Sequence, residues 1–245
     1  MELNAAHAQR AASSPIRAAA RKHEDHATGI PDLAVGTAKP PPFDPLDTID
    51  WGTKLSGNTV RVFFAPAGYV ADGITSDGWN AYEKGQVRKA FARIEAVADL
   101  DFVETGNPVR ADLVLVLDTD GEFSALGYFN PPGTRNEGVG VFNGDAWDRE
   151  PGGSLEVGGF DFVTIVHELL HGLGLAHPHD TGGTSTVLPG VSDPFGDAGA
   201  YGLNQGLYTT MTYNSGYLTG PVGRAGHGGG DWGYEAGPMA LDIAV

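Results

Sequence analysis

The chain has 245 residues, 41% of them hydrophobic, which is enough to bury one sizeable core in a single domain with a tail. It carries 31 acidic and 15 basic residues, and this balance argues against nucleic acid as a partner because phosphate binding requires clustered Lys and Arg. It contains no cysteine, so disulfides, thiol nucleophiles and thiolate zinc ligands are excluded, and any zinc site must use histidine and carboxylate side chains.

The hydropathy of the chain predicts no membrane span, since its apolar runs fall well short of the roughly 20 residues that cross a bilayer. We therefore expect a soluble protein. The formal charge of −16 makes neighbouring molecules repel one another and fits a monomer. The same acidic composition leaves room for calcium sites, although composition alone identifies none.

Residues 1–45 have a composition unlike that of the rest of the chain. They are rich in alanine, include several basic residues and contain the proline cluster Pro40–Pro42, which predicts a tail followed by an extended linker. The tail is either a disordered terminus or a removable propeptide, and both interpretations stay open. No secretory signal is visible, because Met1–Ala20 has no unbroken apolar core. We assign residues 46–245 to one globular domain.

The first half of this domain predicts two strands with a long helix between them. Thr59–Phe64 is rich in β-branched and aromatic residues, which favours a strand. Ser76 or Asp77 can cap a helix that runs to about Ala98, because apolar residues recur there near helical spacing and predict packing on a sheet. Asp112–Asp118 reads DLVLVLD and predicts a second strand.

The second half predicts a short strand, a helix and a long irregular region. Gly138–Phe142 is broken by glycine and predicts a strand at a sheet edge. Phe160–Leu175 predicts a helix ended by glycines, and residues 176–237 are rich in Gly, Asn, Asp and Pro, which favour irregular structure. Pro238–Val245 reads as the start of a final helix, with its proline in the first turn. The sequence stops inside that helix, so we expect the natural protein to continue.

The segment Thr164–His179 reads TIVHELLHGLGLAHPH and has the spacing of a metal site on a helix. His167 and His171 are four residues apart, so both imidazoles lie on one helix face, where they can chelate one ion. Glu168 is offset from His167 by about 100° around the helix, which lets its carboxylate reach a metal-bound water without binding the metal. Glu168 is therefore the candidate catalytic base.

Gly174 predicts the turn that completes this site. Glycine adopts the left-handed angles that end a helix, and such a turn brings His177 to the third ligand position. Three neutral imidazoles leave zinc one open position, as catalytic zinc requires, whereas structural zinc sites are normally closed by four protein ligands. His179 is predicted to be a surface residue, because the three-histidine set is already complete. A helix with purely structural histidines is the alternative.

The sequence HELLHGLGLAHP resembles the zinc-binding consensus of the metzincin metalloproteases. Met211 matches the methionine of the turn that marks this clan, and Tyr213 matches a tyrosine that serralysins and astacins use as an additional zinc ligand. Pro178 and the terminal GPMALDIAV stretch are similar to serralysins, so the resemblance points to the matrixin and serralysin branch. It covers roughly residues 50–245 and implies a catalytic domain without the calcium-binding repeat region of serralysins.

The resemblance implies a metzincin, or zincin-like, α+β fold: a twisted mixed sheet with a long helix, an active-site helix and an irregular C-terminal subdomain. It implies a zinc-dependent endopeptidase in which His167, His171 and His177 hold one zinc ion and Glu168 activates the zinc-bound water. By the same resemblance, Tyr213 leaves the metal when substrate binds and donates a hydrogen bond to the developing oxyanion. The expected partner is a protein or peptide substrate, and the expected location is extracellular.

Several alternatives stay open. The edge strand predicted at Gly138–Phe142 either pairs with the substrate backbone, as the corresponding strand does in metzincins, or is an ordinary edge. The protease acts generally on proteins, or it processes its own precursor or a single partner. A catalytically inactive metzincin-like binding module is the third possibility, although the presence of Glu168 and Tyr213 argues against it.

Overall fold

The structure, a computed structural model, describes residues 42–121, 124–215 and 232–245. Residues 1–41 of the predicted N-terminal tail lie outside the described residues. With η marking 3₁₀ helices, the elements in chain order are η1 (Pro45–Thr48), β1 (Thr59–Phe64), β2 (Val70–Ala71), β3 (Ile74–Thr75), α3 (Ala81–Glu95), β4 (Asp101–Glu104), η2 (Pro108–Arg110), β5 (Leu113–Asp118), β6 (Gly127–Phe129), β7 (Val139–Asn143), α4 (Phe160–Leu173), η3 (Ala200–Gly202) and α5 (Ala240–Ala244).

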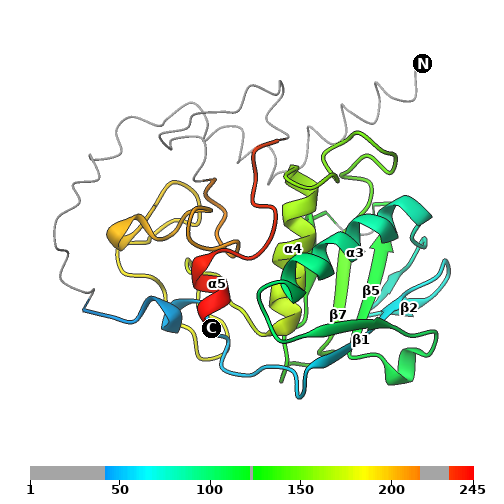
Figure 1. Cartoon of the computed structure of the whole chain (residues 1–245), viewed down its shortest axis with the longest axis horizontal. Coiled ribbons are helices and arrows are strands. Elements are labelled where there is room, and N and C mark those ends of the chain that lie inside the picture. The colour runs from blue at the N-terminus through cyan, green and yellow to red at the C-terminus, as the bar shows by residue number, and fades with distance from the viewer. Residues whose placement is uncertain (1–41, 122–123, 216–231) are drawn as a thin grey trace.

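A mixed sheet with the strand order β4-β1-β5-β7-β6 forms the centre of the molecule (Figure 1). Strands β4, β1, β5 and β7 run parallel to one another, and β6 runs antiparallel to β7. Strands β1 and β5 confirm the two strands predicted in the first half of the domain. The short strand β4 and the hairpin of β2 and β3 were not predicted, because each is too short to show a clear periodicity.

The prediction that Gly138–Phe142 is an edge strand is wrong. The strand itself is present as β7, but it lies between β5 and β6, and β6 is the edge on this side of the sheet. The glycine that suggested an exposed strand has a packing role instead. A side chain at Gly140 would collide with the ring of Phe129 on β6, so the glycine lets the two strands pair closely.

Helix α3 begins later than predicted, at Ala81. Its N-cap is Asn80, whose side-chain oxygen accepts a hydrogen bond from the backbone N–H of Glu83, while the Glu83 carboxylate accepts one from the backbone N–H of Asn80. The predicted caps, Ser76 and Asp77, do not cap the helix. The Ser76 hydroxyl donates to the Ala65 carbonyl, and the Asp77 carboxylate accepts from the Thr119 N–H. The reciprocal capping box therefore decides where the helix starts.

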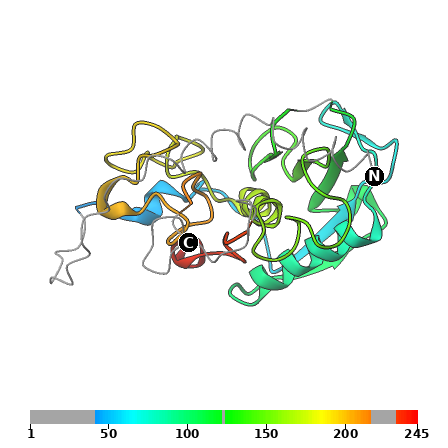
Figure 2. The same ribbon diagram turned by 90° about the horizontal axis from the view of Figure 1, so that it is seen from above.

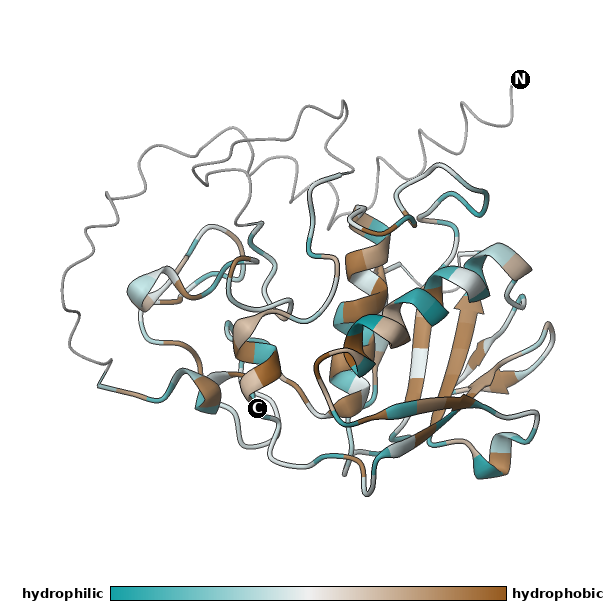
Figure 3. Ribbon diagram, viewed as in Figure 1, coloured by the Kyte–Doolittle hydropathy of each residue, from teal (hydrophilic) through white to brown (hydrophobic). Residues whose placement is uncertain are grey.

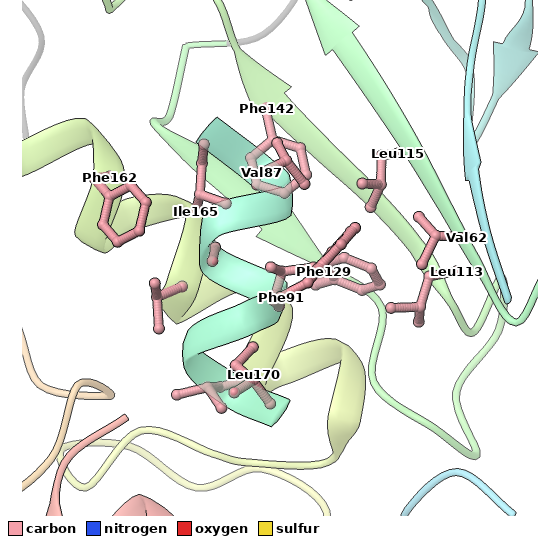
Figure 4. Close-up of a cluster of buried hydrophobic side chains, with 14 of the residues drawn as sticks. Val62, Val87, Phe91, Leu113, Leu115, Phe129, Phe142, Phe162, Ile165 and Leu170 are labelled. Carbon is pink, nitrogen blue, oxygen red and sulfur yellow. The ribbon is translucent and has the colours of Figure 1, made fainter. Parts of the chain in front are cut away.

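The alternation of apolar residues in β1 divides them between two cores. Val60, Val62 and Phe64 face the larger core, which helices α3 and α4 cover together (Figure 4). Phe63 and the following Ala65 face the opposite side, where the hairpin of β2 and β3 covers a smaller cluster. Because each fully buried large apolar side chain contributes about 1.5–3 kcal/mol, the larger core fixes α4 firmly against the sheet.

Helix α4 lies between the two parts of the molecule. Figure 2 shows it nearly end-on, with the sheet and α3 on one side and the loop-rich C-terminal part with α5 on the other. The helix is apolar over most of its length (Figure 3), as expected for a helix that is packed on several sides. The architecture is α+β with a mixed sheet, which confirms the predicted class and is compatible with a metzincin-like fold.

The C-terminal part is mostly irregular, as predicted. Between α4 and α5 the described residues contain a single short helix, η3. The final helix starts at Ala240 rather than at Pro238, because Met239 has extended backbone angles and its N–H donates to the carboxylate of Asp242. In the part of the chain that the structure describes, no helix is both long and apolar enough to cross a bilayer.

Candidate active site

Helix α4 places two of the predicted metal ligands next to each other. His167 and His171 lie one turn apart, are 8% and 9% exposed, and have ring centroids 4.8 Å apart. Glu168, between them in sequence, is also buried. The apolar residues of α4 that pack in the larger core hold this helix in place and so fix the direction of both imidazoles.

The turn after α4 brings the third histidine back to the helix. Gly174 has φ 111°, and a side chain there would collide with the backbone of Thr53, so glycine is required on both grounds. The chain beyond the turn pairs with the N-terminal segment, where the Ala176 N–H donates to the Ile49 carbonyl at 2.7 Å. This pairing positions His177 beside the two helix histidines.

The three histidines converge through the same ring atom. The Nε2 atom of His177 lies 3.0 Å from Nε2 of His167 and 2.9 Å from Nε2 of His171. The structure therefore brings together the three residues that the sequence motif predicted as ligands. They form a group whose nitrogen atoms lie close enough to share one metal ion.

The other nitrogen of each ring has its own partner. A carbonyl or carboxylate oxygen can only accept, so each Nδ1 carries the proton and each Nε2 presents a lone pair. The three Nδ1 contacts are His167 with the Thr210 carbonyl at 2.8 Å, His171 with the Leu175 carbonyl at 2.8 Å, and His177 with the Asp180 carboxylate at 2.9 Å.

This donor set fits a zinc ion. The lone pair on Nε2 of His177 faces those of His167 and His171 at 3.0 and 2.9 Å, and these lone pairs repel unless a cation lies between them. Partners on the far nitrogen are also the usual means of orienting a metal-binding imidazole. Burial lowers the pKa of His167 and of His171 to about 3 and the pKa of His177 well below its ordinary value, so all three rings are neutral, as metal binding requires. The contact between His177 and Asp180 is therefore a hydrogen bond from a neutral ring.

Glu168 lines the same cleft as His171 and His177. Its Oε2 atom is buried and accepts no hydrogen bond within the described ranges. Burial raises the pKa of Glu168 to about 8 in the metal-free protein. The edge strand β6 passes directly over this side chain, because a Cβ at Gly127 would lie only 2.8 Å from Cγ of Glu168. A buried carboxyl group with an unpaired oxygen is suited to proton transfer.

Tyr213 lies over the histidines. Its ring centroid is 4.9 Å from that of His177 and 5.7 Å from that of His167. The predicted surface position of His179 is wrong: its side chain is 4% exposed and lies between the rings of His177 and Tyr213, with centroids at 4.6 and 4.4 Å. The reason is the tight turn after His177, which folds His179 inward onto the other rings.

The turn that contains Met211 supports His167 from below. Met211 is fully buried in the larger core, as predicted for a packing residue. The Asp242 carboxylate on α5 accepts hydrogen bonds from the Thr209 hydroxyl at 2.5 Å and from the Thr210 N–H at 2.7 Å. The Thr210 carbonyl in turn accepts from Nδ1 of His167. A continuous chain of hydrogen bonds thus links the C-terminal helix to the first histidine.

The site opens into a cleft of about 300 Å³. One wall comes from β6 and the residues after it, and the other from the turn around His177 and from Tyr213. The residues that line the cleft are Trp51, Gly127, Tyr128, Phe129, Pro131, Glu168, His171, Ala176, His177, Asp180, Thr181, Gly182 and Tyr213.

A second group of acidic side chains lies away from the cleft. Oxygen atoms of Asp77, Asp118 and Asp120 come within 4.8 Å of one another. The Asp77 carboxylate accepts hydrogen bonds from the backbone N–H and the hydroxyl of Thr119, so it stabilises the loop after β5. Neighbouring carboxylates alone identify no ion, and calcium remains a prediction from the sequence.

Three residues of the site were missed by the motif. Asp180, Asp242 and Trp51 are joined to the histidines or to the cleft only by the fold. Asp180 could have been found, since it follows the third histidine closely and a carboxylate is a common partner of a metal-binding imidazole. Trp51 and Asp242 are too distant in sequence for any local pattern to connect them with the motif.

Comparison with known proteins gives two relatives. The chain is 28% identical over 172 residues to the metallopeptidase AprA of Pseudomonas marginalis, which covers 68% of this chain and 33% of that protein. It is 31% identical over 159 residues to serralysin of Proteus mirabilis, covering 58% of this chain and 30% of that protein. No protein-family model matches the chain. The chain spans about a third of the length of these curated relatives. The predicted resemblance to serralysin-like metalloproteases is confirmed.

Proposed function

We propose that this chain, which resembles the catalytic domain of serralysin-like metalloproteases, is a zinc-dependent endopeptidase. One observation carries the proposal: three unprotonated Nε2 atoms converge beside a buried carboxyl group in an open cleft. The proposed ligands are His167, His171 and His177. When bound there, zinc supplies Lewis acidity to the scissile carbonyl group and to the attacking water.

Glu168 is the proposed general base. Its unpaired Oε2 atom is free to accept a proton from the attacking water and to pass that proton to the leaving amine. The positive charge of a cation at the histidines favours the ionised carboxylate and lowers the pKa of Glu168 from its value in the metal-free protein. The glycine at position 127 supports this role, because a larger residue would push the carboxyl group away.

Tyr213 is the proposed donor to the developing oxyanion and an additional metal ligand in the resting state. Its position over the rings of His167 and His177 supports both roles. Burial raises the pKa of Tyr213, so its hydroxyl keeps its proton and remains a donor.

The substrate is proposed to lie along β6. This strand forms the edge of the sheet next to Glu168, so an extended peptide can add to it as a further strand. The segment Gly138–Phe142, for which this role and that of an ordinary edge were both left open, is unsuited to it because β6 pairs with that side of the strand. Phe129 holds β6 in place, since its ring packs between Gly140 and Gly172 of the neighbouring strand and helix.

Two further features have no ligand or contact behind them. Secretion is proposed from the family resemblance alone. Calcium is a possibility left by the acidic composition, without a ligand set. A self-processing or partner-specific protease remains the alternative, and N-terminal sequencing after incubation with zinc separates it from a general protease.

The decisive experiment compares the wild type with Glu168→Ala on quenched, labelled casein, with the zinc content measured on both. The expected result is about one zinc per chain in each sample, with cleavage by the wild type only. Loss of a general base lowers the rate by roughly 10²–10⁴-fold. If neither sample binds zinc, the three-histidine assignment is wrong. If both bind zinc and neither cleaves casein, the domain is an inactive module or a narrowly specific protease.

A further inference from the structure

One aromatic side chain in the cleft comes from a distant part of the chain. Trp51 belongs to the segment before β1, yet it lines the same cleft as Glu168, His177 and Tyr213. Its backbone is fixed on both sides, because its N–H donates to the Gly174 carbonyl at 3.0 Å and its carbonyl accepts from the Thr184 N–H at 2.9 Å. The position of this residue is therefore set by the turn that carries the third histidine.

The indole ring is held against two glycines. A Cβ at Gly182 would collide with the six-membered ring of Trp51, and a Cβ at Gly183 would collide with its backbone and lie 2.9 Å from Cδ2. The absence of side chains at these two positions lets the indole ring pack closely against the backbone. Trp51 is half-buried and lines the cleft. Among the residues that the structure describes, the indole N–H has no hydrogen-bond partner.

The segment around Trp51 also joins the two walls of the cleft. Two residues later, the Thr53 hydroxyl donates to the Pro132 carbonyl at 2.5 Å, which ties the segment to the loop after β6. Pro131 of that loop lines the cleft together with Trp51. The segment therefore connects the turn after α4 with the loop after β6, and Trp51 lines the cleft together with Glu168, His177 and Tyr213.

We propose that Trp51 is a specificity-determining residue that forms a subsite for an apolar, preferably aromatic, side chain of the substrate. The subsite lies between Trp51 and Pro131, which both line the cleft. The inference rests on the proposed peptidase function, since it assigns a substrate preference to that same cleft. An aromatic side chain with a fixed backbone favours another ring packed against it.

The residues that line the subsite disfavour a basic substrate side chain there. Among the described residues that line the cleft, only Asp180 and Glu168 carry an acidic group. The Asp180 carboxylate already accepts a hydrogen bond from Nδ1 of His177. Trp51 and Pro131 offer mostly apolar surface to the cleft, and burying another apolar group against it is favourable.

The test uses ten-residue quenched peptides of Gly, Ala and Ser that carry one Phe, moved through successive positions. The matched peptides carry Leu, Lys or Gly in place of Phe. Mass spectrometry of the products gives the spacing between this residue and the cleaved bond. For the wild type we expect one spacing at which Phe raises kcat/KM above the values for Lys and Gly.

At that spacing, Trp51→Ala should lower kcat/KM for the Phe peptide by about tenfold and leave the Gly peptide within twofold, because one stacked apolar contact is lost. Trp51→Phe should retain most of the preference. The control Tyr201→Ala removes an exposed aromatic residue that lies outside the cleft lining, and should change neither peptide. Equal losses for all peptides, or a preference for Lys, would overturn the proposal.

A binding measurement separates this inference from the proposed function. In the Glu168→Ala background, calorimetry should show that adding Trp51→Ala weakens binding of the Phe peptide about tenfold and leaves the Gly peptide unchanged. This result supports the subsite even if the wild type cleaves nothing. Unchanged binding of the Phe peptide refutes the subsite even if casein is cleaved.

Discussion

Replacing Asp242 should weaken metal binding although this residue never touches the site. Its buried carboxylate accepts hydrogen bonds from the Thr209 hydroxyl and from the backbone N–H groups of Thr210 and Met239, at 2.5, 2.7 and 2.8 Å. Asp242→Ala leaves all three donors without this partner. Because the Thr210 carbonyl accepts a hydrogen bond from His167, the loss should reach the first proposed zinc ligand.

The expected size of the effect follows from these contacts. Two of the three donors, the Thr209 hydroxyl and the Thr210 N–H, are buried, and each costs about 1–3 kcal/mol when unsatisfied, so Asp242→Ala should lower the free energy of unfolding by about 2–6 kcal/mol. Loss of an outer-shell partner typically weakens metal binding by about 10–100-fold. Asp242→Asn should be far milder, because the amide oxygen can accept from the two N–H groups while the Thr209 hydroxyl turns to accept from the amide.

Urea titration measures the stability of each variant, and competition with a chelator measures its zinc affinity. A second control is Val116→Ala, which removes buried apolar contacts in the smaller core, on the face of the sheet away from α4, and also lowers stability. It should leave the zinc affinity unchanged. If Asp242→Ala is destabilised but binds zinc as tightly as the wild type, the hydrogen-bond chain does not orient His167 and the reasoning is refuted.

Two further predictions follow from the buried ionisable groups. Tyr213→Phe should leave the zinc content near one per chain. It should lower kcat for peptide cleavage by about 10²-fold with little change in KM, because a donor to the oxyanion is lost. An unchanged kcat would contradict this role. Burial raises the pKa of Glu235 to about 7. Between the ordinary pKa of a glutamate and pH 7, the folded protein therefore keeps a proton that the unfolded chain releases. The free energy of unfolding falls as the pH rises through this range. Glu235→Gln should therefore stabilise the protein by up to about 3 kcal/mol at pH 8 and have little effect at pH 4, and equal effects in urea titrations at both pH values would count against it.

Local patterns in the sequence determined the candidate metal site and the elements that carry it. The spacing of His167, Glu168 and His171 is a property of one helix, so it could be interpreted without knowledge of any neighbour. The left-handed turn at Gly174 follows from the freedom of glycine, and it accounts for the return of His177. The strands β1 and β5 were predictable for the same reason, because β-branched and alternating apolar residues act within a single segment.

The tertiary structure alone decided which of these segments become neighbours. Only the sheet order shows that β6, rather than the segment at Gly138–Phe142, is the edge beside Glu168. The burial of His179 and the link from Asp242 to His167 likewise depend on how the C-terminal loops fold back.

Trp51 is the clearest case. It reaches the cleft because its backbone pairs with the turn after α4, more than a hundred residues further along the chain. Periodicity and turn chemistry describe residues that are close in sequence, whereas such contacts are selected by the packing of the whole core.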